Sequence, residues 1–178
     1  MPSNPPIILL DSMVVAGVFA LTKSGNNIDE RKNTYKAVII DLVSILGKSY
    51  LLSVPTPVCF ELMCWNEIWK NFVLNSKSQL FFFAKHSITS DVLQTAAEFS
   101  IKSNTCRYDE KIHKIKSLDS IIAAYGISNG HYILTENQKG FPESHFELIG
   151  SRVMLLKQHE GYPPRTFLYL LKPRKSSI

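Results

Sequence analysis

Four oxygen-bearing side chains stand beside apolar runs at widely separated places in the chain, and these are Asp11, Glu61, Asp119 and Asn137. Oxygen ligands that are spread along a chain, each at the end of a buried element, suggest one site assembled by folding. Hard divalent cations such as Mg²⁺ and Mn²⁺ need carboxylate and amide oxygens of this kind. The sequence therefore predicts a Mg²⁺ or Mn²⁺ site to which all four residues contribute.

The chemistry of such a site follows from its charge. Carboxylates that are brought together repel one another, so keeping them all ionised costs free energy, and a divalent cation removes that cost. A bound cation can also position a water, lower its pKa and stabilise charge on a phosphate under attack. Phosphodiester hydrolysis is the reaction class that most needs this combination, and it requires no Ser or His nucleophile.

Each of the four residues also has an ordinary structural interpretation. Asp11 could cap the helix that follows it. Glu61 and Asp119 stand near expected helix starts, where acidic side chains complement the helix dipole. Asn137 could be a turn residue ahead of Gly140. For each residue taken alone, the structural interpretation is at least as good as the metal-ligand interpretation. The four residues taken together, in their order along the chain, favour a metal site.

Composition and charge limit the function classes. A chain of 178 residues with 45% hydrophobic residues can form a single domain with a sizeable core. Its formal net charge of +5 suits a partner that carries phosphates, although many ordinary proteins are equally basic. The start of the sequence has no basic region typical of a secretory signal, and no apolar run is long enough to span a membrane. We therefore expect a cytoplasmic protein without membrane segments.

The cysteines point to the same compartment. Cys59, Cys64 and Cys106 are an odd number and form no CxxC pair. Because Cys59 and Cys64 lie in an apolar segment that is expected to be helical, we expect buried, reduced thiols rather than a disulfide or a thiolate metal site.

Strands and helices are expected to alternate along most of the chain. The expected strands are 7–10, 50–54, 80–84 and 131–135, and the expected helices are 12–21, 28–46, one from about Pro55 to Phe72, 90–99 and 117–125. The strands are unbroken apolar runs, which is typical of sheets buried on both faces. This order predicts an α/β fold, a three-layer α/β/α sandwich around a central, mainly parallel sheet.

The last part of the chain is expected to add strands. A weaker strand is expected at 146–149, and two more at 153–157 and 166–172 are joined by a turn near Gly161. We therefore divide the chain into a domain of residues 1–150 and a C-terminal extension, 151–178, which packs on the same domain. Extension of the sheet is the simplest role for these strands.

The expected topology brings the four polar residues to one edge. In open parallel sheets, ligands bind beyond the carboxyl ends of the strands. Asp11 and Asn137 fall just past strand ends, and Glu61 and Asp119 fall near the starts of helices that begin at the same edge if the crossovers are regular. All four side chains can therefore share one rim of the sheet.

Four ordered segments carry a family resemblance, and these are Ile8–Ser12, Val54–Leu62, Leu118–Ala124 and Ile133–Asn137, with Phe141 and Pro142 following. In order, spacing and structural context they resemble PIN-domain proteins over about residues 6–150. The resemblance implies a PIN-like fold and metal-dependent hydrolysis of RNA.

The resemblance also implies roles for individual residues. Asp11, Glu61 and Asp119 correspond to the family's three best-defined acidic positions around Mg²⁺ or Mn²⁺. Asn137 matches a fourth position, Asp in many members and Asn in others, and Thr135 matches a hydroxyl often found just ahead of it. An amide at 137 removes one negative charge, so a second cation would bind less tightly. Toxin-type members are often homodimers that an antitoxin neutralises. Besides RNA, the resemblance therefore suggests two protein partners, an antitoxin and a second copy of the chain.

Several groups near the same rim could contact an RNA backbone, and these are Ser12, Lys114, Lys116, Thr135 and Lys139. A solvated loop is the alternative interpretation of the lysines. Trp65 and Trp69 are spaced for packing on one helix more than for stacking bases.

Other function classes fit the sequence less well. A haloacid-dehalogenase-type phosphatase needs a second Asp two residues after the first, where this chain has Met13, and the chain has no GxxxxGK[ST] or GxGxxG nucleotide motif. The serious alternative is a PIN-like module that binds RNA or a partner protein without cutting. Asn137 is the residue that most supports this alternative.

Overall fold

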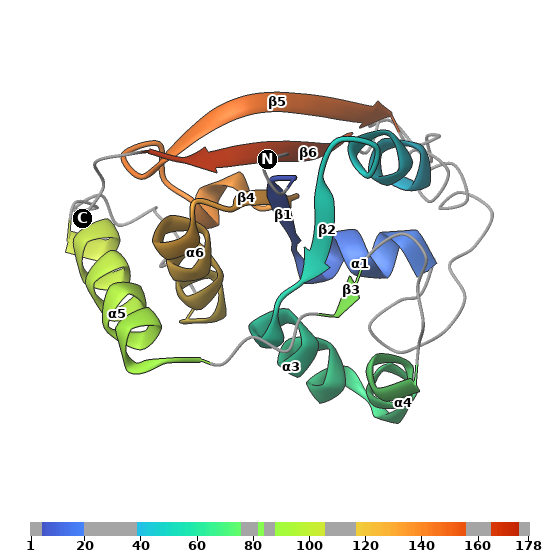
Figure 1. The fold of residues 1–178 in the computed structure, drawn as a ribbon, viewed down its shortest axis with the longest axis horizontal. Helices are drawn as coiled ribbons and strands as arrows, with labels where there is room; N and C mark the ends of the chain where they lie inside the picture. The colour runs from blue at the N-terminus through green and yellow to red at the C-terminus, as the bar shows by residue number, and fades with distance from the viewer. Residues whose placement is uncertain are drawn as a thin grey trace.

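The structure is a computed structural model, and it describes residues 5–19, 39–75, 82–83, 88–105, 117–155 and 165–174. It is a mixed α/β fold built on one six-stranded sheet with the strand order β3-β2-β1-β4-β6-β5 (Figure 1). The N-terminal strand β1 lies near the middle of this sheet, so the residue that follows it emerges close to the ends of its neighbours.

Parallel strands form one side of the sheet. β1 (Ile7–Leu10) pairs in parallel with β2 (Leu51–Val54) and with β4 (Tyr132–Thr135). β3 (Phe82–Phe83) continues the parallel order beside β2. The strands expected at 7–10, 50–54 and 131–135 are therefore confirmed, and of the strand expected at 80–84 only these two residues lie within the described part.

Antiparallel strands form the other side, so the sheet is mixed. β6 (Arg165–Pro173) runs antiparallel to both β4 and β5 (Phe146–Leu155). The separate strands expected at 146–149 and 153–157 are one continuous strand, with a register shift between Leu148 and Gly150. A bulge of this kind bends a strand without ending it, which is why the sequence suggests two short strands. The expected domain boundary at residue 150 falls inside β5.

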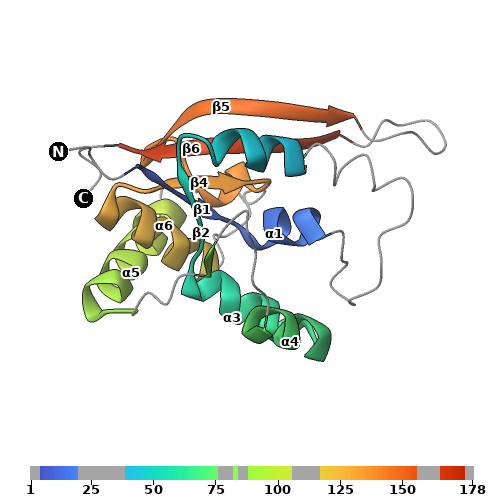
Figure 2. The same ribbon diagram turned by 45° about the vertical axis from the view of Figure 1, so that its right-hand side comes forward.

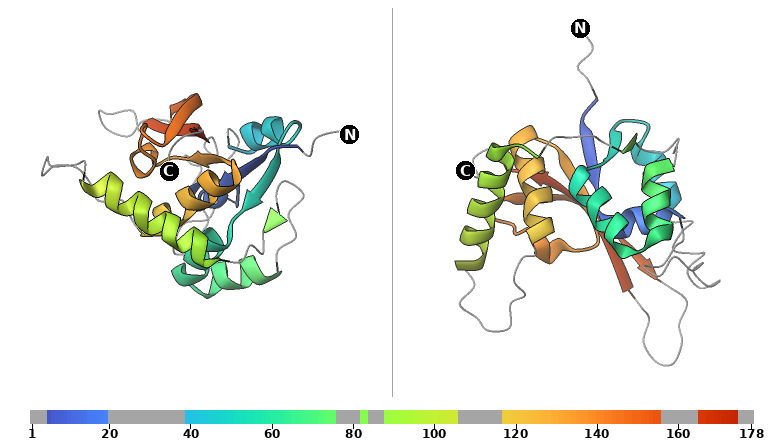
Figure 3. Two further views of the ribbon diagram at one scale, coloured as in Figure 1. Left: turned by 60° about the vertical axis from the view of Figure 1, so that its left-hand side comes forward. Right: turned by 90° about the horizontal axis from the view of Figure 1, so that it is seen from below.

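Helices connect and cover the strands, and the described ones are α1 (Ser12–Phe19), residues 39–46, α3 (Thr56–Trp65), α4 (Glu67–Asn75), α5 (Ser90–Thr105) and α6 (Ser117–Asn129). α5 and α6 pack side by side, and α3 contacts α6, α4 and α1 (Figures 2 and 3). The remainder of the helix expected at 28–46, the end of the one expected at 12–21 and the turn near Gly161 lie outside the described residues.

The helix expected from Pro55 to Phe72 is divided at Asn66, which was not expected. The backbone of Asn66 is extended, and its side-chain oxygen accepts hydrogen bonds from the backbone N–H groups of Ile68 and Trp69 at 3.0 and 3.1 Å. Asn66 therefore caps a new helix, α4, in the manner typical of this residue type. Trp69 is fully buried and packs edge-on against Trp65, which is the packing role expected for the pair.

The start and the buried face of α5 differ from the prediction. From the sequence, Ser90 is the candidate cap, but the hydroxyl of Thr89 accepts a hydrogen bond from the backbone N–H of Val92 at 3.3 Å, so Thr89 is the cap. The sequence also predicts that Leu93 faces inward, but Leu93 is 49% exposed, whereas Phe99 is buried. The helix also runs to Thr105, beyond its expected end at residue 99.

Gly126 lies inside α6 rather than at its end. A Cβ atom at this position would lie 3.0 Å from Cδ1 of Ile133 and 3.3 Å from the carbonyl oxygen of His131, so glycine allows the helix to approach β4 closely. The helix ends at Asn129, and Gly130 follows with a φ of 66°, a conformation in which glycine carries no steric penalty.

The cysteine prediction is half correct. Cys59 and Cys64 are both free thiols, but neither is fully buried, since Cys59 is half-buried and Cys64 is exposed, and Cys106 lies outside the described residues. Burial raises the pKa of the Cys59 thiol to about 11, so this group is inert at neutral pH. Among the described residues, no helix combines the length and the apolar character that crossing a membrane requires.

Candidate active site

Asp11 is fixed at the carboxyl end of β1. Its backbone N–H donates to the carbonyl oxygen of Leu134 at 3.0 Å, which continues the parallel pairing of β1 with β4. The side chain is 6% exposed, and its Oδ1 accepts a hydrogen bond from the backbone N–H of Ser12 at 2.7 Å. Through this oxygen the residue holds the first turn of α1.

The second oxygen of Asp11 faces β4. The hydroxyl of Thr135 donates to Asp11 Oδ2 at 2.6 Å, and the backbone N–H of Asn137 donates to the same hydroxyl at 2.9 Å. Thr135 is fully buried, so this short bond to a carboxylate lies away from bulk water. Residues 124 positions apart are thereby joined, because β1 and β4 are neighbours in the sheet.

Asn137 extends the contact to α6. Its side-chain NH₂ group donates to Asp119 Oδ2 at 3.1 Å, which is the only possible direction because an ionised carboxylate can only accept. Asp119 lies in the first turn of α6 and is half-buried. A continuous series of hydrogen bonds thus runs from Asp11 through Thr135 and Asn137 to Asp119, and we call these four residues the Asp11–Asp119 cluster.

Gly140 makes room for this cluster, a role that the sequence did not reveal. It ends the short 3₁₀ turn Gln138–Gly140 and is buried. A Cβ atom at this position would lie 2.9 Å from both Asn137 Nδ2 and Asp119 Oδ2, closer than such atoms approach in proteins. The absence of a side chain here lets the turn close over the carboxylate of Asp119.

Glu61 is the predicted site residue that the described contacts do not join to the cluster. It is half-buried on α3, whose first residue follows β2 at the same edge of the sheet as Asp11. Within the described part of the chain, no hydrogen bond or ion pair links it to Asp11, Asp119 or Asn137. Its role as a ligand stays a prediction.

Glu136 is a third acid near the cluster that sequence reasoning did not select. Burial and, to a lesser degree, the negative charge of Asp11 together raise the pKa of its carboxyl group from 4.5 to about 7. Its Oε1 atom is buried and has no hydrogen-bond partner among the described residues. In the sequence, Glu136 is marked only by its position between Thr135 and Asn137. An alternating strand pattern would place its side chain on the opposite face from theirs, so the sequence offers no reason to select it.

The predicted substrate groups are only partly described. Ser12 is buried and its hydroxyl lies 3.4 Å from Asp11 Oδ1, so it supports that carboxylate. Lys139 is exposed on the turn that follows Asn137. Lys114 and Lys116 lie outside the described residues.

The donor atoms can be tested against a divalent cation. Among the described residues, no three His, Cys, Asp or Glu side chains are close enough together to hold a metal ion. Mg²⁺, however, is commonly held by one or two carboxylates, with water and substrate phosphates completing its six oxygens. Asp11 and Asp119 are linked through the side chains of Thr135 and Asn137. These two carboxylates could hold Mg²⁺ together with water and substrate phosphates, but they could not form a cage made of protein ligands alone.

Comparisons with known proteins do not decide the family. No protein-family model matches the chain, and a search of curated proteins gives no significant match. The PIN-domain resemblance therefore depends on the four sequence segments alone, and the function must be argued from the geometry of the cluster.

Proposed function

We propose that the protein is a metal-dependent endoribonuclease with a PIN-like, three-layer arrangement of helices around its sheet. The observation that carries the proposal is the Asp11–Asp119 cluster, in which hydrogen bonds of 2.6, 2.9 and 3.1 Å connect two carboxylates from distant parts of the chain. Each carboxylate accepts a hydrogen bond from a side chain fixed on the protein. Two carboxylates held at the same end of a sheet are an arrangement that Mg²⁺ or Mn²⁺ would complete.

Each residue then has a defined task. Asp11 and Asp119 would hold the cation, Thr135 orients Asp11, and Asn137 orients Asp119 through its amide. Glu61 would act on the same site from α3, and Lys139, with Lys114 and Lys116, would contact substrate phosphates. The cation, when bound, supplies positive charge for the phosphate under attack and lowers the pKa of water.

A second candidate is a PIN-like module that binds RNA or a protein without cutting. Two observations favour it: residue 137 is a neutral amide, and the amide donates its protons to Asp119 rather than adding a negative charge. A cluster with fewer carboxylates binds a cation less tightly, since affinity rises with the charge of the ligands. For the nuclease, the proposed setting is the cytoplasm, as a toxin with an antitoxin partner or a homodimer.

Cleavage of labelled RNA by the wild-type chain tests the proposal. We expect Mn²⁺ or Mg²⁺ to produce shorter products and EDTA to abolish them, because the two carboxylates alone provide no nucleophile. Binding of the same RNA is measured in parallel by a gel-shift assay in EDTA. RNA that binds and stays intact with either metal would support the binding module and would overturn the nuclease.

A methyl group at position 140 should reduce this activity without unfolding the protein. In Gly140→Ala the new Cβ displaces the carboxylate of Asp119 and the amide of Asn137, both 2.9 Å away. We expect a loss of cleavage of about 10- to 100-fold, the range seen when groups that orient metal ligands are changed. Cleavage rates and thermal unfolding of the variant are compared with those of the wild type.

Gly150→Ala is the matched control, because a Cβ at Gly150 meets no atom within 4 Å. It should retain wild-type cleavage. Equal rates for both glycine variants would show that the close approach of Gly140 to Asp119 has no functional importance.

A further inference from the structure

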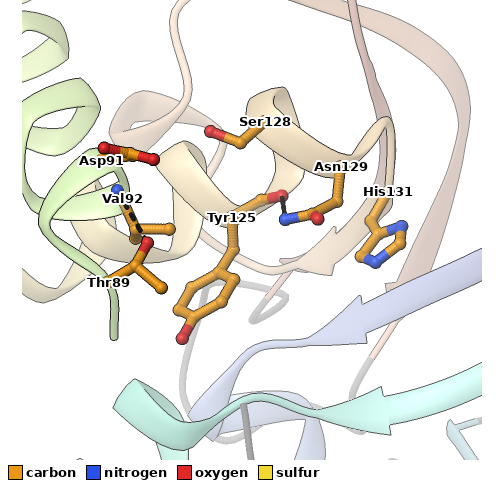
Figure 4. Close-up of a pocket in the computed structure, with 7 residues that line it drawn as sticks. All are labelled: Thr89, Asp91, Val92, Tyr125, Ser128, Asn129 and His131. Atoms are coloured by element: carbon orange, nitrogen blue, oxygen red, sulfur yellow. Dashed lines mark hydrogen bonds between the residues drawn. The ribbon is translucent and has the colours of Figure 1, made fainter. Parts of the chain in front are cut away.

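A pocket of about 370 Å³ lies between the start of α5 and the end of α6 (Figure 4). None of its lining residues belongs to the Asp11–Asp119 cluster. Its lining side chains include Asp91, Tyr125, Ser128, Asn129 and His131. Asn129 is ten residues further along α6 than Asp119, a rise of roughly 15 Å at 1.5 Å per residue. The volume is within the range of small-molecule sites in proteins.

The pocket has an apolar floor and a polar rim. Tyr125 and Val92 are only 4% and 6% exposed and form the floor. Asp91, Ser128 and Asn129 are exposed and stand around it, as Figure 4 shows. A ligand here would place an apolar or planar part on the floor and its polar atoms at the rim.

The rim is negatively charged. Asp91 is the acidic residue of the lining, and within the described part of the chain its carboxylate has no hydrogen bond and no ion pair. The amide of Asn129 donates to the carbonyl oxygen of Tyr125 at 3.0 Å, so its own oxygen remains an acceptor. The side-chain oxygens of Asp91 and Asn129 are therefore hydrogen-bond acceptors that the rim offers to a ligand.

The ends of the two helices strengthen this preference. α6 presents its carbonyl end at the pocket, where the dipole is negative, and its last turn carries no basic residue. The amino end of α5 would favour an anion, but Thr89 caps it through the backbone N–H of Val92, and the negative charge of Asp91 lies in its first turn. An anionic ligand would meet the Asp91 carboxylate, whereas a cation would be stabilised by it.

We propose that this pocket binds a guanidinium group, carried either by a small molecule or by an arginine side chain of a polypeptide. A guanidinium is planar, so it can lie against the ring of Tyr125 while its N–H groups donate to the Asp91 carboxylate and the Asn129 oxygen. This site needs neither a metal nor RNA, so it stands or falls separately from the nuclease.

Binding of defined probes to the full chain tests the proposal. Two-dimensional ¹H–¹⁵N NMR spectra are recorded in EDTA at pH 8. The probes are agmatine, the peptide acetyl-Gly-Arg-Gly-amide, N-acetyl-citrulline amide as a neutral counterpart, and inorganic phosphate. We expect saturable shifts at the amides of residues 89–92 and 128–131 with agmatine or the arginine peptide.

Two variants make the test specific. Asp91→Asn should weaken binding of the guanidinium probe by about tenfold, since it removes the charge that accepts the hydrogen bonds. Ser128→Arg should abolish it, because a guanidinium supplied by the protein competes for the same carboxylate. Asp41→Asn is the matched control: Asp41 is an exposed acid on the helix of residues 39–46, far along the chain from the pocket.

The outcomes separate the sources and the competing ideas. Saturation by agmatine alone identifies a small-molecule ligand, and tighter saturation by the peptide identifies a polypeptide. The proposal is overturned if neither probe saturates these shifts, if the citrulline compound binds equally well, if phosphate binds in their place, or if Asp91→Asn matches Asp41→Asn.

Discussion

Asp119→Asn is expected to lower Mn²⁺-dependent RNA cleavage by more than about 100-fold, because changes to residues that merely orient metal ligands already cost 10- to 100-fold. In the wild-type protein the side-chain nitrogen of Asn137 donates to Asp119 Oδ2 at 3.1 Å. The substitution removes a negative charge but keeps an oxygen that can accept this hydrogen bond. The fold around α6 should therefore persist while the affinity for the cation falls. Initial cleavage rates across a Mn²⁺ titration measure both effects.

Three further variants show whether the loss is specific. Asp11→Asn should be as inactive as Asp119→Asn, because the two carboxylates are proposed to hold one cation. Glu61→Gln should lose about 10- to 100-fold, as expected of a group that acts on the site from outside. Asp41→Asn, an exposed acid on residues 39–46, should cleave normally. If Asp119→Asn cleaves as fast as Asp41→Asn, the cluster is not the active site.

The positions of β1 and β4 could be predicted because each is a short, unbroken apolar run. Ile7–Leu10 and Tyr132–Thr135 read as buried strands, and their parallel pairing brings Asp11 beside Thr135. That Asn137 lies at the same edge follows from the same topology. This part of the site could be predicted because it depends on backbone pairing, which hydrophobic patterns specify.

The errors concern single residues whose effect depends on tertiary neighbours. Gly126 reads as a helix end, yet it lies inside α6 because Ile133 packs where a side chain would be. Asn66 stands within an amphipathic helical pattern, but its extended backbone ends α3 and its side chain caps α4 through Ile68 and Trp69. Glycine and asparagine each serve several local structures, so sequence alone does not select among them.

The chemistry of the site was harder to predict than its location. Glu136 follows the last residue of β4, and an alternating pattern gives no reason to place its carboxylate near Asp11. Its buried Oε1 and the raised pKa depend on how β4 ends and on what covers it. Gly140 likewise gains its importance from the 2.9 Å approach to Asp119, a residue 21 positions earlier. Such contacts are set by tertiary structure and have no local sequence signal.

Glu136→Gln is expected to stabilise the metal-free protein at pH 8. Burial and the charge of Asp11 raise the pKa of Glu136 from 4.5 to about 7 in the folded protein. The folded state therefore holds this proton more tightly than the unfolded state, so the carboxylate costs stability as pH rises from about 4.5 to 7, and the full cost remains above pH 7. After allowance for partial exposure to solvent, removing the charge should raise the free energy of unfolding by about 1–2 kcal/mol.

Urea unfolding in EDTA at pH 8 and pH 5 measures this effect. The gain should be present at pH 8 and largely absent at pH 5, where Glu136 is protonated in the folded wild-type protein. In thermal unfolding it corresponds to a rise of about 2–4 °C for each kcal/mol. Glu143→Gln is the control, because Glu143 is exposed and its loss should leave stability unchanged at both pH values. If Glu136→Gln is no more stable than Glu143→Gln at pH 8, the Glu136 carboxylate is well solvated. Its position beside Asp11 then has no effect on the free energy of unfolding.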